Sequence, residues 1–121
     1  MTESSKASRI VIWVLSILLG FVFLMAGIPK LLGAEAHVQH FVRWGYPDWF
    51  RIAVGAVESA SAILLLIPRL ASVGAAGIVT IMAGATYTHV IRVPEEASRA
   101  PFTLGLLVLA ALVGYARRPK G

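Results

Sequence analysis

Cysteine is absent from the 121-residue chain, and charged side chains are scarce. Without a thiol, the chain cannot by itself exchange disulfides or hold an iron–sulfur cluster through cysteine ligands. Only 14% of the residues are charged and 58% are hydrophobic, whereas about a quarter of the residues in a typical soluble domain are charged. The composition therefore excludes both an ordinary soluble domain and thiol chemistry carried by this chain alone.

The hydrophobic residues gather into four blocks, which predict an all-α bundle of four transmembrane helices. A spanning helix needs about 20 mostly apolar residues, with a range of ~17–25. We read "AGIPK" as a poor signal-peptide cleavage sequence, so the first block is interpreted as a retained span. The last block is short and is expected to snorkel or to thin the bilayer locally. Within a single domain, 1–121, the predicted spans are residues 10–28, 48–67, 70–91 and 102–115.

Basic residues flank the apolar blocks, and this placement indicates membrane anchoring rather than nucleic-acid binding. The formal net charge is +5. With four spans, six Lys and Arg residues fall on the side that carries both termini, and five fall on the other side. This small bias predicts an integral protein of the bacterial cytoplasmic membrane with both termini in the cytoplasm.

The segment between the first two predicted spans reads "AEAHVQHFVRWGYPDW" and has amphipathic spacing. Val38, Phe41 and Val42 share one helical face, and aromatic residues that prefer the lipid headgroup level follow at once. We therefore predict a short interfacial helix here. His37 and His40 have a spacing that can ligate a metal, but no acidic or thiol partner shares their face. We accordingly expect no metal site.

Small and polar residues form a stripe on each of the first three predicted spans. Such stripes let membrane helices approach closely, so bundle packing is their simplest explanation. We predict that the three spans converge on one common seam. The stripes are Ser16, Gly20, Phe23 and Gly27, then Arg51, Gly55, Glu58, Ser59 and Ala62, then Gly77, Thr80, Gly84 and Thr88.

Glu58 falls inside the second predicted span, where a lone charge costs about 2.5–3.5 kcal/mol on insertion scales. Lys30 and His89 fall near the membrane surface at which that span begins, and a lysine can reach inward along its stem. We therefore predict that the three side chains meet in one half of the bundle. Two interpretations stay open for this cluster. It is either a polar staple between helices, or a pocket for a polar head group or a proton path.

Three segments, "FLMAGIPKLLG", "HFVRWGYPDWFRIAVGAVESASAILLLIPRLA" and "AAGIVTIMAGATYTHVIR", resemble the DoxX-like family of small four-helix membrane proteins. The resemblance covers residues 18–92, and its motifs occur in the family's order and spacing. By the family pattern, the marked positions in this chain are Gly27, Lys30, Leu31, Gly45, Pro47, Gly55, Glu58, Pro68, Gly84, Ala85 and His89.

The resemblance implies a redox setting, because some relatives are membrane subunits of thiosulfate:quinone oxidoreductases and others are linked to oxidative-stress complexes. The fold is also similar to that of quinone-reducing thiol oxidases such as vitamin K epoxide reductase, whose thiol chemistry a cysteine-free chain cannot share. We expect a redox-associated subunit, with catalytic residues unassigned, that binds a quinone-like molecule at Lys30, Glu58 and His89. The expected supporting residues are Gly27, Gly55, Ser59, Gly84 and Thr88.

Two other functions remain open at this stage. The first is a non-catalytic assembly or scaffold protein, in which the polar cluster only holds the bundle together. The second is a carrier of small solutes or protons that works as a homo-oligomer. The expected partners are the lipid bilayer and either a redox protein or further copies of the chain.

Overall fold

The computed structural model describes residues 3–118, and every regular element in this range is helical. The all-α prediction is therefore confirmed, including a separate helix between the first two predicted spans. The elements in chain order are α1 (Glu3–Leu32), α2 (Glu35–Trp44), α3 (Asp48–Leu65), α4 (Ala71–Tyr87), the π-helical turn η1 (Thr88–Arg92), the 3-10 helix η2 (Pro94–Arg99) and α5 (Ala100–Ala116).

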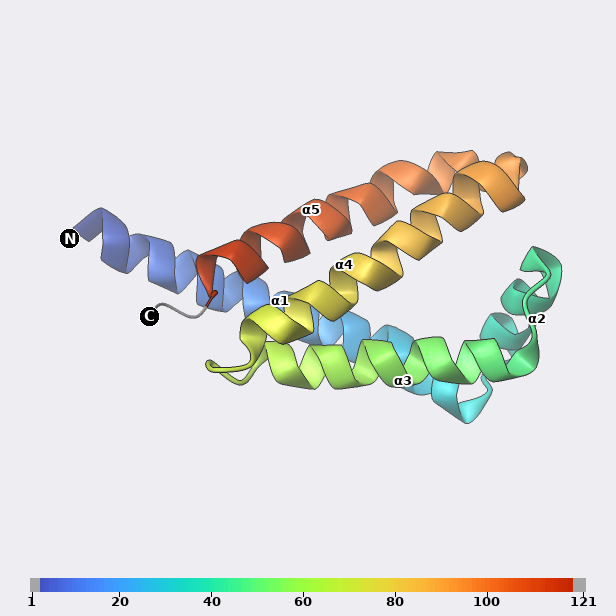
Figure 1. Ribbon diagram of the computed structural model, residues 1–121, viewed down its shortest axis with the longest axis horizontal. Coiled ribbons are helices and arrows are strands. Elements are labelled where there is room, and N and C mark those ends of the chain that lie inside the picture. The colour runs from blue at the N-terminus through green and yellow to red at the C-terminus, as the bar shows by residue number, and fades with distance from the viewer. Residues whose placement is uncertain (1–2, 119–121) are drawn as a thin grey trace.

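The helices form two pairs, α1 with α3 and α4 with α5, which are joined where α3 meets α4 (Figure 1). Helix α2 lies at one end of the molecule, and the turn between α3 and α4 lies at the other, near both chain termini (Figure 1). We call these the α2 end and the terminal end. Elements η1 and η2 lie at the α2 end, where they contact α2.

Three helical segments are long and apolar enough to cross a membrane, so four spans are not established by length and composition alone. Helix α3 falls outside this set because its 18 residues include the charged side chains of Asp48, Arg51 and Glu58. The last candidate segment is longer than the predicted span, since the 3-10 helix η2 runs directly into α5. The three segments are Lys6–Leu32, Ala71–Arg92 and Pro94–Ala116.

The first two predicted stripes form the contact between α1 and α3, and every residue in them is buried. The two backbones touch at the glycines. A Cβ atom added to Gly55 would lie 2.8 Å from the carbonyl oxygen of Gly27 and 2.9 Å from the amide nitrogen of Leu31. The absence of a side chain at Gly55 is therefore what allows this close approach.

The third stripe does not join that contact, so the predicted common seam of three spans is wrong. A Cβ atom added to Gly84 would meet nothing within 4 Å, and Thr80 is exposed. Helix α4 touches α3 near its start, where a Cβ at Gly74 would lie 2.7 Å from the Leu65 amide nitrogen. Beyond this contact α4 diverges from α3 and runs beside α5 (Figure 1).

Candidate functional site

The predicted contact between Lys30 and Glu58 is present. Lys30 lies in the last turn of α1, which continues through Pro29, and Glu58 lies on the face of α3 that meets α1. The Lys30 Nζ atom is 2.8 Å from Oε1 of Glu58, and their side chains are only 13% and 2% exposed. Each charge thus has the partner that reduces the cost of placing it at this depth.

A buried serine beside the pair lacks a hydrogen-bond partner. The Lys30 ammonium donates to the Ala26 carbonyl at 3.3 Å and also lies at ion-pair distance from Glu58. Within the described part of the chain, the Oγ atom of Ser59, which is next to Glu58 and buried, has no hydrogen-bond partner. Because a buried unpaired polar group costs about 1–3 kcal/mol, a further polar partner here would be stabilising.

Arg51 belongs to the predicted stripe on the second span but not to the predicted site. It links the end of α1 to the start of α3 beside the ion pair. It is 5% exposed, it donates to the carbonyl of Lys30, and it forms an ion pair with Asp48 at 3.1 Å. A basic side chain is well placed at the carboxyl end of α1, where carbonyl groups are otherwise unpaired. The available signal was a charged residue on the same face as Gly55 and Glu58.

His89 has a different partner from the one predicted. Its Nδ1 atom lies 3.2 Å from Oε1 of Glu96, which also accepts a hydrogen bond from Trp44 Nε1 at 3.0 Å. Glu96 further pairs with Arg43 at 3.2 Å and with Arg99 at 3.8 Å. We call these five residues the Glu96 network; it fastens α2 to η1 and η2.

The predicted three-residue cluster is therefore divided. Among the described residues, His89 forms no hydrogen bond or ion pair with Lys30 or Glu58. Counting residues along the helices placed His89 at the same end of the bundle as Lys30 but could not give its direction, because the π-helical turn η1 changes the helical register there. Glu96 was missed because the short charged loop reads as solvent-exposed. The sequence feature that could have identified Glu96 is its position seven residues after His89.

Thr88, a predicted supporting residue, joins the same end of the molecule. Its hydroxyl lies 2.7 Å from the hydroxyl of Tyr46 and donates to the Gly84 carbonyl at 2.9 Å. The Arg92 guanidinium covers the Tyr46 ring at 4.7 Å and donates to the Trp44 carbonyl at 3.1 Å. Gly84 thus contributes a carbonyl group and not close helix packing.

Helix α2 supplies Arg43 and Trp44 to the Glu96 network and also contacts α1 and α3, which carry the Lys30–Glu58 pair. Burial, followed by the charge of Lys30, lowers the pKa of His37. Burial, followed by the charge of Arg43, lowers the pKa of His40. The His40 ring stacks on Trp44 with 5.6 Å between centroids. Helix α2 therefore connects the Glu96 network to the helices that carry the ion pair, and positive charge around α2 disfavours further protonation.

Buried intramembrane charge, long apolar helices and an exposed apolar surface define a small multi-helix integral membrane protein. The sequence model of the DoxX-like family matches residues 14–113. The chain therefore belongs to the DoxX-like family, as its motifs predicted. It is also similar to the uncharacterized protein YdgD of Bacillus subtilis (strain 168), with 30% identity over 97 residues, which cover 76% of this chain and 85% of the relative. No solved structure matches the chain.

Proposed function

We propose that this protein is a membrane subunit of a redox assembly and that it binds a quinone-like head group beside Lys30 and Glu58. The observation that supports this most directly is the buried Ser59 Oγ, which has no hydrogen-bond partner among the described residues and lies beside the Lys30–Glu58 ion pair. A quinone presents carbonyl oxygens that accept hydrogen bonds, and its reduced form presents hydroxyl groups that donate them. The Ser59 hydroxyl and the Lys30 ammonium donate and the Glu58 carboxylate accepts, so the site offers groups for both forms.

Each residue has a distinct proposed role. Lys30 and Ser59 hold the oxidised head group, and Glu58 holds a proton near it. A bound quinone would supply two-electron, two-proton chemistry, and we propose a partner protein as the source of electrons. His89 does not touch the pair, so we assign it a positioning role through the Glu96 network, which holds α2 over this end of the bundle.

The membrane arrangement is part of the same proposal. At a rise of about 1.5 Å per residue, the 18 residues of α3 nearly match a hydrocarbon core about 30 Å thick. We propose α3 as the fourth span, with Asp48 and Arg51 at the surface and both termini in the cytoplasm of a bacterium. A reporter that is active only outside the membrane and is fused after Gly121 should give no signal. A strong signal would overturn this orientation.

A non-catalytic assembly role is the second candidate, and one observation favours it. The same ion pair that would serve a ligand already links α1 to α3 and neutralises both charges at 2.8 Å. If this link is the whole purpose of the pair, the protein acts as a scaffold, and a stoichiometric partner should co-purify without any quinone.

The deciding experiment is gentle detergent extraction followed by mass spectrometry of co-purifying quinones, lipids and proteins. Ser59→Ala removes the unpaired donor but keeps the ion pair, so bound quinone should fall severalfold while thermal stability changes little. Ser61→Ala is the matched control, because Ser61 is a buried serine on the same helix that faces α4. Equal quinone content in both variants would reject the site. Solute flux in proteoliposomes would indicate a carrier instead.

A further inference from the structure

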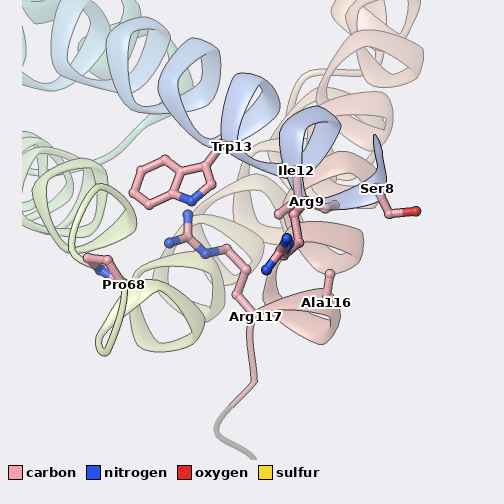
Figure 2. A pocket seen from close by; sticks show the side chains of 7 residues that line it. All are labelled: Ser8, Arg9, Ile12, Trp13, Pro68, Ala116 and Arg117. Carbon is pink, nitrogen blue, oxygen red and sulfur yellow. The ribbon is translucent and has the colours of Figure 1, made fainter. Parts of the chain in front are cut away.

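The terminal end of the bundle carries a surface pocket to which no function has yet been assigned. Its volume is about 410 Å³, and it lies between the start of α1, the α3–α4 turn and the end of α5 (Figure 2). Two guanidinium groups point into it in Figure 2. The lining residues are Ser8, Arg9, Ile12, Trp13, Pro68, Ala116 and Arg117.

Arg117 is held in a fixed position in this pocket. It donates to Ser16 Oγ at 2.9 Å, and its guanidinium lies 4.1 Å from the centre of the Trp13 ring. Ser16 is fully buried and in turn donates to the Ile12 carbonyl, so this anchor is part of α1. Burial lowers the pKa of Arg117, although an arginine remains charged at neutral pH. A fixed guanidinium with unused N–H groups is the geometry that binds phosphate in a bidentate manner.

The pocket has positive charge but no carboxylate in its lining. Within the described residues, the acidic members of the ion pairs are Asp48, Glu58 and Glu96, which lie in α3 and η2 and away from this pocket. Arg9 and Arg117 take part in none of these pairs. Among the described residues, no acidic side chain pairs with either guanidinium, so a bound anion would complete the site.

A second hollow continues from the first along the outer face of α1. It has a volume of about 420 Å³ and shares Arg9 and Trp13 with the pocket. Its other lining residues are mainly aliphatic, namely Lys6, Ile10, Val14 and Ile17. A charged pocket that opens into an apolar groove on a membrane helix matches a phospholipid, with its phosphate in the pocket and an acyl chain along the groove.

We propose that Arg9 and Arg117 bind the phosphate group of an anionic ligand, and that this phosphate is carried by a phospholipid. Free inorganic phosphate shares the same oxyanion chemistry, whereas the apolar groove beside Trp13 favours the lipid. The predicted orientation places the site in the cytoplasmic leaflet, where anionic lipids attract basic residues near the surface. Occupation would tie α1, the α3–α4 turn and α5 together at this end.

The test is a titration of the purified full-length chain in detergent, with melting temperature as the readout. Dioleoylphosphatidylglycerol should raise the melting temperature in a saturable manner, and dioleoylphosphatidylcholine should not. Arg9→Gln and Arg117→Gln should each weaken the apparent affinity about tenfold, as expected when a charged hydrogen-bond donor to phosphate is lost. Arg9→Gln is the cleaner variant, because Arg9 does not share the structural contacts of Arg117 with Ser16 and Trp13.

The matched control is the double variant Arg69→Gln/Arg118→Gln, at two exposed basic residues of this end that line neither hollow. It removes as much charge near this end as the Arg9/Arg117 double variant does, but it leaves both arginines of the pocket in place. Retained lipid affinity in the control, with loss in the pocket variant, supports the proposal. Equal losses in both, or the absence of a saturable shift with either phosphatidylglycerol or inorganic phosphate, overturns it. A shift with inorganic phosphate alone retains the oxyanion site and rejects the lipid as its source.

Discussion

The two helix pairs, α1 with α3 and α4 with α5, differ in the kind of side chain at their contacts. Helices α1 and α3 meet through buried polar groups, including the Lys30–Glu58 ion pair, whereas α4 and α5 contain no charged residue between Ala71 and Tyr87 or between Ala100 and Ala116. The polar contact between α4 and α5 is a hydrogen bond of 2.7 Å between the hydroxyls of Thr86 and Thr103. In a bilayer, apolar surface alone gives helices little reason to associate, so each pair depends on its packing and on these few polar contacts.

The comparison shows which pair of helices has its relative position fixed by specific contacts. An ion pair between buried charges fixes the relative position of α1 and α3, because sliding either helix separates the charges. Close packing of Gly55 against Gly27 adds a second constraint at the same place. The α4–α5 pair lacks an ion pair among the described residues, and its glycine contact is with a side chain: a Cβ added to Gly114 would lie 2.9 Å from the Cβ of Ala75. Substitutions should therefore have larger effects in the first pair than in the second.

The largest effect is expected from breaking the ion pair. Glu58→Gln and Lys30→Met each leave the opposite charge buried without compensation, and such changes typically cost about 3–5 kcal/mol. The double variant leaves no charge and should recover much of the loss. Melting temperatures of the four proteins in detergent form a double-mutant cycle that measures the coupling. Simple addition of the two losses would show that the pair contributes no coupling.

A smaller effect is expected where the two backbones touch. Gly55→Ala introduces a Cβ that would lie 2.8 Å from the Gly27 carbonyl oxygen, so α1 and α3 must separate, and overpacking of this kind costs about 1–3 kcal/mol. Gly84→Ala is the matched control on α4, where the new Cβ meets nothing within 4 Å. Its higher helix propensity should leave the melting temperature unchanged or slightly raised. Equal losses at the two glycines would remove the distinction between the pairs.

Much of the fold can be predicted from the sequence, because the hydrophobic blocks and the turn residues between them indicate local structure. The apolar blocks predict the helices, and the amphipathic spacing before Trp44 predicts α2. The divergence of α4 from α3 does not follow from pattern, since a stripe such as Gly77, Thr80, Gly84 and Thr88 marks a face that permits close packing without identifying a partner. Which neighbour occupies that face depends on the turn at Pro68 and on tertiary packing.

The site shows the same division. Lys30 and Glu58 could be paired from sequence because Lys30 is predicted at the surface where the span of Glu58 begins, and its long side chain can reach inward. His89 could not, because a π-helical turn changes the register of the last residues of that span. Glu96 lies in a segment whose composition is typical of exposed loops, yet its side chain accepts from Trp44 and pairs with cations on either side. Partners contributed by irregular segments leave little periodic signal.

Removal of the Thr86–Thr103 hydrogen bond should have a smaller effect than the changes at α1 and α3. Hydrogen bonds between membrane helices average about 0.6 kcal/mol, so Thr86→Val and Thr103→Val should each lower the melting temperature only slightly. Thr80→Val is the control, because the Thr80 hydroxyl donates only to the Ala76 carbonyl of its own helix among the described contacts. A decrease in melting temperature as large as that of Glu58→Gln would show that polar contacts stabilise the two helix pairs equally.

The smallest effect concerns α2, which contacts α1 and α3 and carries His37 and His40. In the folded chain the pKa of each histidine is lowered from its ordinary value of 6.5, chiefly by burial. Below that pH the folded chain therefore binds fewer protons than the unfolded chain, and stability must fall as the pH decreases. The decrease should begin near pH 6.5 and stay modest, because both side chains are only half-buried.

Melting temperatures at pH 7.5 and 5.5 test this for the wild type and for the double variant His37→Gln/His40→Gln. The variant should lose most of the pH dependence, because it removes the two side chains whose pKa burial lowers. Since α4 and α5 contain no titrating carboxylate, lysine or histidine within Ala71–Tyr87 and Ala100–Ala116, the acid sensitivity should come from the polar half of the molecule. An unchanged pH dependence in the variant would show that His37 and His40 are not its source.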